Sequence, residues 1–82
     1  MEHQDWQTEE WLVWRLNGHG KNIQCVIGLL PRGFQGRYLC NGSLLYEYMF
    51  DSWTEAFSWA CEKRNGFVSR GWIQAIPFHK AS

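Results

Sequence analysis

The feature that most constrains the fold is a run of residues at helical spacing between Asp51 and Trp72, DSWTEAFSWACEKRNGFVSRGW. Side chains that recur every three or four positions lie on one face of an α-helix. The face predicted here consists of Trp53, Ala56, Phe57, Ala60, Cys61, Arg64, Phe67 and Val68. Because no other stretch of the chain keeps this spacing over several turns, the rest of the chain is expected to fold around a single helix.

The ends of this helix are indicated by capping residues. Ser52 and Glu55 match a capping box, in which the serine hydroxyl accepts from a free backbone amide of the first turn. Gly66 and Gly71 are two alternative ends, since glycine readily takes the left-handed conformation after a helix. The apolar face continues in phase beyond Gly66, and a glycine inside a helix costs only about 1 kcal/mol relative to alanine. We therefore favour a helix over residues 53–70.

The other apolar residues form short runs typical of β-strands, separated by turns rich in glycine, asparagine and proline. Strands are expected at residues 10–16, 22–30, 37–40, 43–50 and 72–76, with a loop at 31–36. Asn41-Gly42 predicts a two-residue type I′ turn, because both residue types tolerate positive φ. The predicted fold class is α+β: an antiparallel sheet of four to five strands with one helix on one face, in the order β-β-β-β-α-β.

The chain is short but rich in large side chains, with 82 residues that include six Trp, five Phe and three Tyr. This length predicts one domain. We expect an acidic N-terminal tail at residues 1–9, a single α+β domain at residues 10–78 and a C-terminal tail at residues 79–82. Trp6 is the one tail residue expected to pack against the domain. No apolar run approaches the roughly 20 residues of a membrane-spanning helix, and the N-terminus lacks the apolar segment of a secretory signal.

The cysteines favour a reducing compartment. Cys25, Cys40 and Cys61 are odd in number and form no C-x-x-C pair. Such a set argues against a disulfide framework and predicts a cytoplasmic protein.

The sequence contains no recognisable catalytic constellation. His3, His19 and His79 lie far apart along the chain, and no metal-binding or nucleotide-binding motif is present. The cysteines lie in predicted strands or beside the apolar helix face, where they are expected to be small core residues. The sequence therefore predicts a protein that is not an enzyme and that needs no cofactor, metal or small-molecule substrate.

The hairpin register predicts more apolar surface than one helix covers. Counting back from the turn pairs Cys40 with Ser43, Leu39 with Leu44, Tyr38 with Leu45 and Arg37 with Tyr46. The face assigned to the helix carries Leu39, Leu44, Tyr46, Tyr48 and Phe50, and the outer face carries Tyr38, Leu45 and Met49 with Cys40, Ser43 and Glu47. If Leu12, Trp14 and Leu16 turn inward, Trp11, Val13 and Val26 join the outer face. Such patches usually mark a partner surface, unless the sheet curls or the segment with Trp6 folds across it.

Two further features bear on partners. Trp59 lies off the apolar stripe of the helix, so we expect it to face solvent or a partner as an interface anchor. The loop Pro31–Arg37 interleaves Arg32, Phe34 and Arg37 with two glycines, a combination that can contact phosphate and stack a base. A net charge of zero and the acidic N-terminus oppose approach to a polyanion.

These observations predict a small non-enzymatic protein-binding module. By analogy, its role would be that of a stoichiometric inhibitor or adaptor, such as phages and mobile elements use against host protein machines. Self-association through the sheet face as a homodimer is an open possibility, and the alternative is a small nucleic-acid-binding protein. The predicted partner-binding residues are Arg32, Phe34, Arg37, Tyr38, Leu45, Met49, Trp11 and Trp59.

Overall fold

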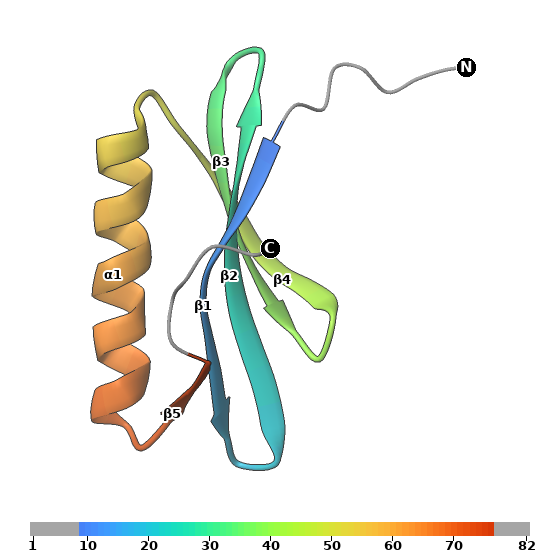
Figure 1. Ribbon diagram of the computed structural model, residues 1–82, viewed down its shortest axis with the longest axis vertical. Coiled ribbons are helices and arrows are strands. Elements are labelled where there is room, and N and C mark those ends of the chain that lie inside the picture. The colour runs from blue at the N-terminus through green and yellow to red at the C-terminus, as the bar shows by residue number, and fades with distance from the viewer. Residues whose placement is uncertain (1–8, 77–82) are drawn as a thin grey trace.

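The computed structural model describes residues 9–76, which form a five-stranded antiparallel sheet with one helix packed on one face (Figure 1). In chain order the elements are β1 (Glu9–Gly18), β2 (Lys21–Leu30), β3 (Gly33–Cys40), β4 (Ser43–Phe50), α1 (Trp53–Ser69) and β5 (Ile73–Ile76). The sheet order is β4-β3-β2-β1-β5, so that β4 and β5 form its two edges. The predicted fold class and element order are confirmed. The prediction for Trp6 and those for the two tails up to residue 8 and from residue 77 lie outside the described residues.

Both ends of α1 are fixed by the expected residues. The Glu55 amide donates to the Ser52 hydroxyl oxygen at 3.2 Å. At the other end, the Gly71 amide donates to the Val68 carbonyl at 3.0 Å and the Trp72 amide to the Phe67 carbonyl at 3.1 Å. This pair of bonds is a Schellman motif, and the left-handed residue that it needs is Gly71, with φ of 100°. The helix therefore continues through Gly66, as the sequence predicts.

Each turn between successive strands from β1 to β4 contains only two residues. Asn41 and Gly42 have φ of 52° and 88°, which confirms the predicted positive-φ turn between β3 and β4. The expected loop at residues 31–36 is wrong, because only Pro31 and Arg32 form the turn and β3 begins at Gly33. A Cβ atom at Gly33 would lie 2.6 Å from the Phe50 carbonyl oxygen, and its φ is 141°. This glycine therefore allows two strands to approach rather than extending a loop.

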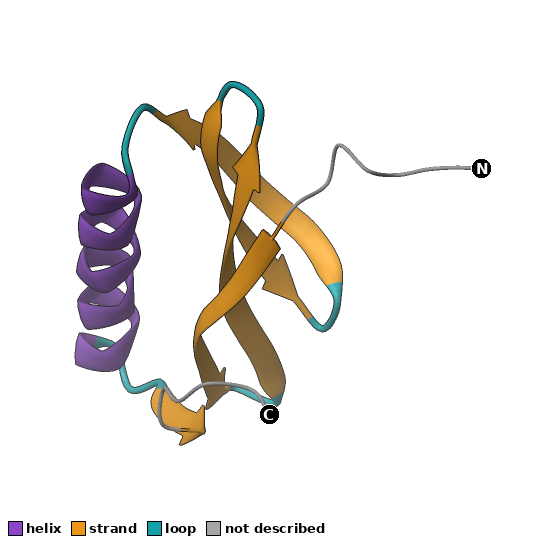
Figure 2. Cartoon of the chain, turned by 45° about the horizontal axis from the view of Figure 1, so that its top comes forward, coloured by secondary structure: helices purple, strands orange, loops and turns teal. Residues whose placement is uncertain are grey.

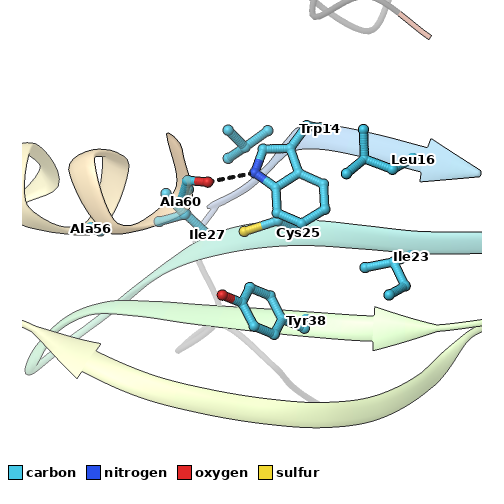
Figure 3. Close-up of a cluster of buried hydrophobic side chains, with 9 residues drawn as sticks. Trp14, Leu16, Ile23, Cys25, Ile27, Tyr38, Ala56 and Ala60 are labelled. Atoms are coloured by element: carbon cyan, nitrogen blue, oxygen red, sulfur yellow. Dashed lines mark hydrogen bonds between the residues drawn. The ribbon is translucent and has the colours of Figure 1, made fainter. Parts of the chain in front are cut away.

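The core lies between α1 and the three central strands (Figure 3). Its buried members are Val13, Trp14, Leu16, Ile23, Cys25, Ile27, Tyr38, Ala56 and Ala60. The two buried helix residues are both alanines, so the helix backbone can approach the sheet closely. The Trp14 indole N–H donates to the Ala60 carbonyl oxygen at 2.8 Å, which satisfies a polar group inside this cluster.

The register of β3 and β4 contains a β-bulge that the sequence did not indicate. The predicted pairs of Cys40 with Ser43 and of Leu39 with Leu44 are confirmed, but Tyr38 lies opposite Tyr46. Leu45 is therefore an extra residue in β4. The predicted pairs of Tyr38 with Leu45 and of Arg37 with Tyr46 are wrong, because the bulge moves every pair beyond it by one residue. As a result, Tyr38 lies in the core and Leu39 on the outer face.

A second bulge in β1 reverses the sides predicted for its first residues. The register shifts between Leu12 and Trp14, which leaves Val13 as the extra residue. Trp14 and Leu16 are buried as expected. Leu12 is exposed, whereas Val13 belongs to the core and Trp11 packs against Trp53 of α1 with ring centroids 5.0 Å apart. The inward placement of Leu12 and the outward placement of Trp11 and Val13 are thus corrected.

The sheet face opposite α1 is more polar than the sequence predicted. It carries side-chain pairs across neighbouring strands: Arg15 with Gln24, Arg37 with Glu10, Gln35 with Glu47, and Asn22 with Asn17. Val26 lies among them and is only 8% exposed. On this face the exposed apolar side chains are confined to Leu12 and to the β4 edge, so the predicted apolar surplus covers only part of it.

Candidate interaction surface

The apolar side chains that the fold leaves uncovered are concentrated on one edge strand, β4. Every residue of β4 is exposed except Phe50, which is half-buried. The large exposed side chains are Leu44 (52%), Leu45 (51%), Tyr46 (57%), Tyr48 (48%) and Met49 (42%). Contiguous exposed apolar residues of this kind mark interaction sites more often than isolated ones do.

The exposure of β4 has a geometrical cause. The twist of the sheet carries the Asn41-Gly42 end of the β3–β4 hairpin away from α1, as Figures 1 and 2 show. One helix lies over the centre of the sheet, and only the Phe50 end of β4 approaches its start. Tyr46 and Tyr48 lie on the helix side of the sheet, because Tyr46 opposes the buried Tyr38. Tyr48 reaches Trp59 of α1, but both tyrosines remain about half exposed.

The two exposed tyrosines are held by neighbouring rings. Tyr46 and Tyr48 stack with centroids 6.2 Å apart, and Tyr46 meets Tyr38 edge to face at 6.0 Å. Tyr48 in turn meets Trp59 at 5.6 Å. Rings fixed in this way have little conformational entropy to lose on binding, which is the property that makes tyrosine effective at interfaces.

The backbone of β4 is the second feature of this strand that favours an interaction. An edge strand offers N–H and C=O groups on the side that has no neighbouring strand, and many proteins block such edges with lysine or proline. The sequence of β4, SLLYEYMF, contains neither, and its one charged residue, Glu47, accepts a hydrogen bond from Gln35 at 3.1 Å. By contrast, β5 at the opposite edge has only four residues and pairs with the last part of β1. The edge suited to strand addition is therefore β4.

The predicted nucleic-acid residues do not form one surface. Arg32 is exposed in the turn before β3. Phe34 packs on the helix side, with its ring 6.0 Å from that of Trp53. Arg37 lies on the opposite face and forms an ion pair with Glu10. Because the aromatic ring and this guanidinium point to opposite faces, and the latter is neutralised, they cannot jointly contact a phosphate and stack its base.

Two of the predicted partner-binding residues are parts of the fold. Tyr38 is buried, and Trp59 stacks on it with centroids 4.9 Å apart and ring planes at 7°. A Cβ atom at Gly36 would overlap the Trp59 ring, so this glycine provides the space that the indole fills. The solvent-facing position predicted for Trp59 is therefore wrong. Leu45 and Met49 are exposed as predicted, and both lie on β4.

Trp11 lines a separate apolar hollow. This open hollow of about 360 Å³ lies between the helix start and the sheet, and its lining consists of Trp11, Leu29, Phe34 and Trp53. Ligand sites typically combine an apolar lining with convergent polar groups. The side chains that line this hollow carry no polar atoms other than the indole nitrogens of Trp11 and Trp53.

The titratable groups of the core are not arranged for chemistry. Burial, with a smaller contribution from Cys61, raises the pKa of the Cys25 thiol from 9.0 to about 12. Burial likewise raises the pKa of Tyr38. A nucleophilic cysteine needs the opposite shift, toward the thiolate. Within residues 9–76, no group of three or more His, Cys, Asp or Glu side chains is placed to hold a metal ion.

The helix content also bears on membranes. Over the described part of the chain, no helix has the length and apolar character to cross a bilayer.

No protein family, curated protein or solved structure matches this chain.

Proposed function

We propose that this chain is a small protein-binding module that docks its partner along the edge strand β4. The observation that carries the proposal is that seven of the eight residues of β4 are exposed although most of the strand is apolar or aromatic. In the corresponding mode of recognition, an extended segment of the partner adds a strand to the sheet. Backbone hydrogen bonds supply affinity, and the side chains on both faces of β4 supply specificity.

The two faces of β4 offer a partner different kinds of contact. On the helix side, Tyr46 and Tyr48 form a stacked pair that offers a rigid aromatic surface. On the outer face, Met49 lies beside the polar pair formed by Gln35 and Glu47. An apolar centre with polar groups at its margin is the usual anatomy of a protein interface.

Binding of this kind requires no reaction, so the module acts by occupying its partner, as an inhibitor or adaptor does. We place it in the cytoplasm, because Cys25, Cys40 and Cys61 are all free thiols and such thiols persist in a reducing compartment. The buried, protonated Cys25 fits a structural rather than a catalytic role.

Site-specific photo-crosslinking tests the docking edge. The full chain carries benzoylphenylalanine in place of Tyr46, or in place of Ser58 on the exposed side of α1 as a matched control. Irradiation in the cells of origin is expected to give a crosslinked product from position 46 and not from position 58. Adding Leu44→Lys should remove the product, because a lysine on an edge strand opposes pairing. Equal crosslinking from both positions, or from neither, would overturn the proposal.

A further inference from the structure

We infer that the partner of β4 is β4 of a second copy of this chain, paired antiparallel about a two-fold axis at Tyr46. This inference deepens the proposed function and rests on it, because it needs β4 to be a docking edge. A symmetric contact uses one surface patch twice, so it forms only where the patch is complementary to itself. The sequence and exposure of β4 meet this condition in one register.

The symmetry restricts the possible registers. Two antiparallel edge strands are related by a two-fold axis perpendicular to the sheet, and directly opposite residues have their side chains on the same face. One residue of β4 must therefore lie opposite its own copy. A centre at Leu45 or at Tyr48 leaves only about five residues of each strand paired, because β4 has eight residues. Centres at Tyr46 and at Glu47 both pair about seven.

Charge decides between the two long registers. A centre at Glu47 places two carboxylates directly opposite each other, which is unfavourable across a strand pair. A centre at Tyr46 places Tyr46 against itself and Glu47 against the bulged Leu44–Leu45 segment, which lies on the same outer face as Glu47. Tyr46 and Tyr48 of the two copies then form one aromatic row on the helix side, and the like charges are separated. The bulge at Leu45 occurs once in each copy, next to the axis, where it adds to the local twist.

The exposed area limits a dimer through β4 to a weak, reversible contact. Five large side chains of β4 are each about half exposed. At about 200 Å² for a large side chain, they offer about 500 Å² per copy. Two copies would bury about 1,000 Å² at most, which is the lower limit for a specific interface. A net charge of zero removes long-range repulsion between the copies. The contact is therefore a concentration-dependent one.

The resulting assembly is closed. Pairing joins two five-stranded sheets into one continuous sheet, with both copies of α1 on the same face. The β4 edges are consumed, and the edges that remain are the two copies of β5, each four residues long. An isologous contact of this kind stops at two chains, whereas a head-to-tail contact would continue into fibres.

A pair of cysteine variants tests both the partner and the register. In the inferred dimer, the two copies of residue 46 are directly opposite, at about 4.5–5.5 Å between Cα atoms, a spacing that a disulfide bridges. The two copies of residue 48 are offset by four residues, or about 13 Å along the strand. Tyr46→Cys is therefore expected to form a disulfide-linked dimer on mild oxidation, and Tyr48→Cys is not. Both side chains are about half exposed, so neither replacement empties the core.

Oxidation of the wild-type chain is the control for crosslinking through the native cysteines. Sedimentation of the wild-type chain at increasing concentration measures the oligomeric state without any new cysteine. We expect a monomer–dimer equilibrium that Leu44→Lys shifts to monomer by at least tenfold in dissociation constant. Crosslinking of Tyr48→Cys as readily as of Tyr46→Cys would overturn the register, and a wild-type monomer at millimolar concentration would overturn the second copy as partner.

The crosslinking from position 46 separates failure of this inference from failure of the proposed function. A product with twice the chain mass supports the second copy. A product containing a different polypeptide, together with a monomeric wild type, overturns the second copy and leaves the docking edge in place. The absence of any crosslinked product would overturn both the second copy as partner and β4 as the docking edge.

Discussion

β2 and β4 are strands of similar composition with opposite surroundings. Each has six apolar or aromatic residues, in ten positions for β2 and in eight for β4. Yet β2 is largely buried and β4 is almost wholly exposed. The difference comes from position: β2 is the central strand beneath α1, whereas β4 is an edge that the twist carries away from the helix (Figure 2). Apolar content alone therefore does not determine which strand belongs to the core.

A matched pair of truncations tests this comparison, and it has the largest expected effect on the free energy of unfolding. Ile27→Ala in β2 and Leu45→Ala in β4 remove the same number of carbon atoms, but Ile27 is fully buried and Leu45 is half exposed. We expect Ile27→Ala to lower the free energy of unfolding by about 2–5 kcal/mol and Leu45→Ala by about 0.5 kcal/mol. Urea denaturation at a concentration where the chain is monomeric measures both. Similar losses would mean that β4 is covered in solution.

Glycine replacements should sharpen the contrast between packed and open positions. At Gly36, a new Cβ atom overlaps the Trp59 ring, so Gly36→Ala is expected to destabilise the fold by about 1–3 kcal/mol. At Gly66, inside α1, nothing lies within 4 Å of such an atom. Gly66→Ala should therefore stabilise the fold by about 0.5–1 kcal/mol, through the higher helix propensity of alanine. Thermal unfolding of the two variants gives the signs, and a stable Gly36→Ala would show that Trp59 does not need this space.

The burial of β2 also predicts a pH dependence. The pKa of the Cys25 thiol is raised from 9.0 to about 12, so above pH 9 the unfolded chain loses this proton while the folded chain keeps it. The unfolded state then binds fewer protons, and stability falls as pH rises, by about 1.4 kcal/mol per pH unit for one group. Tyr38, whose pKa burial also raises, should steepen the fall above pH 10.

Urea denaturation between pH 7 and 10 measures this slope. Cys25→Ala is expected to be less stable at every pH, since it truncates a buried side chain, but to show a shallower decline between pH 9 and 10. An unchanged slope in that variant would assign the decline to other groups.

The sequence was sufficient for the elements that local rules determine. The capping serine, the left-handed Gly71 and the Asn41-Gly42 turn each satisfy a local backbone requirement, so the helix and the β3–β4 hairpin could be predicted. The bulges at Val13 and Leu45 could not, because they depend on how neighbouring strands fit together rather than on any residue type in the chain. Each bulge changes the side of the sheet that the following residues occupy.

The candidate site was predictable in part for the same reason. Leu45 and Met49 were correctly predicted to be exposed, whereas Tyr38 was placed on the wrong face because of the missed bulge. Trp59 lies off the helical stripe, and its burial depends on the space above Gly36, a residue of a different element. Helical periodicity contains no information about such a space. A helix over a twisted sheet buries a wider arc than the stripe alone indicates.

The smallest expected effect concerns how β2 is covered on the face that lacks a helix. Val26 is only 8% exposed there, and its partners across the sheet are Leu12 and Arg37. A long basic side chain can cover apolar surface with its methylene stem, and the charge of Arg37 is held by Glu10. Because exposed ion pairs contribute about 0–1 kcal/mol, we expect the stem to matter more than the charge. Arg37→Met, which keeps the stem, should cost less than Arg37→Ala in urea denaturation, and equal losses would assign the effect to the ion pair. Such a stem covers the outer face of β2, whereas within residues 9–76 no strand pairs with the far edge of β4, and this difference explains why β4 is exposed.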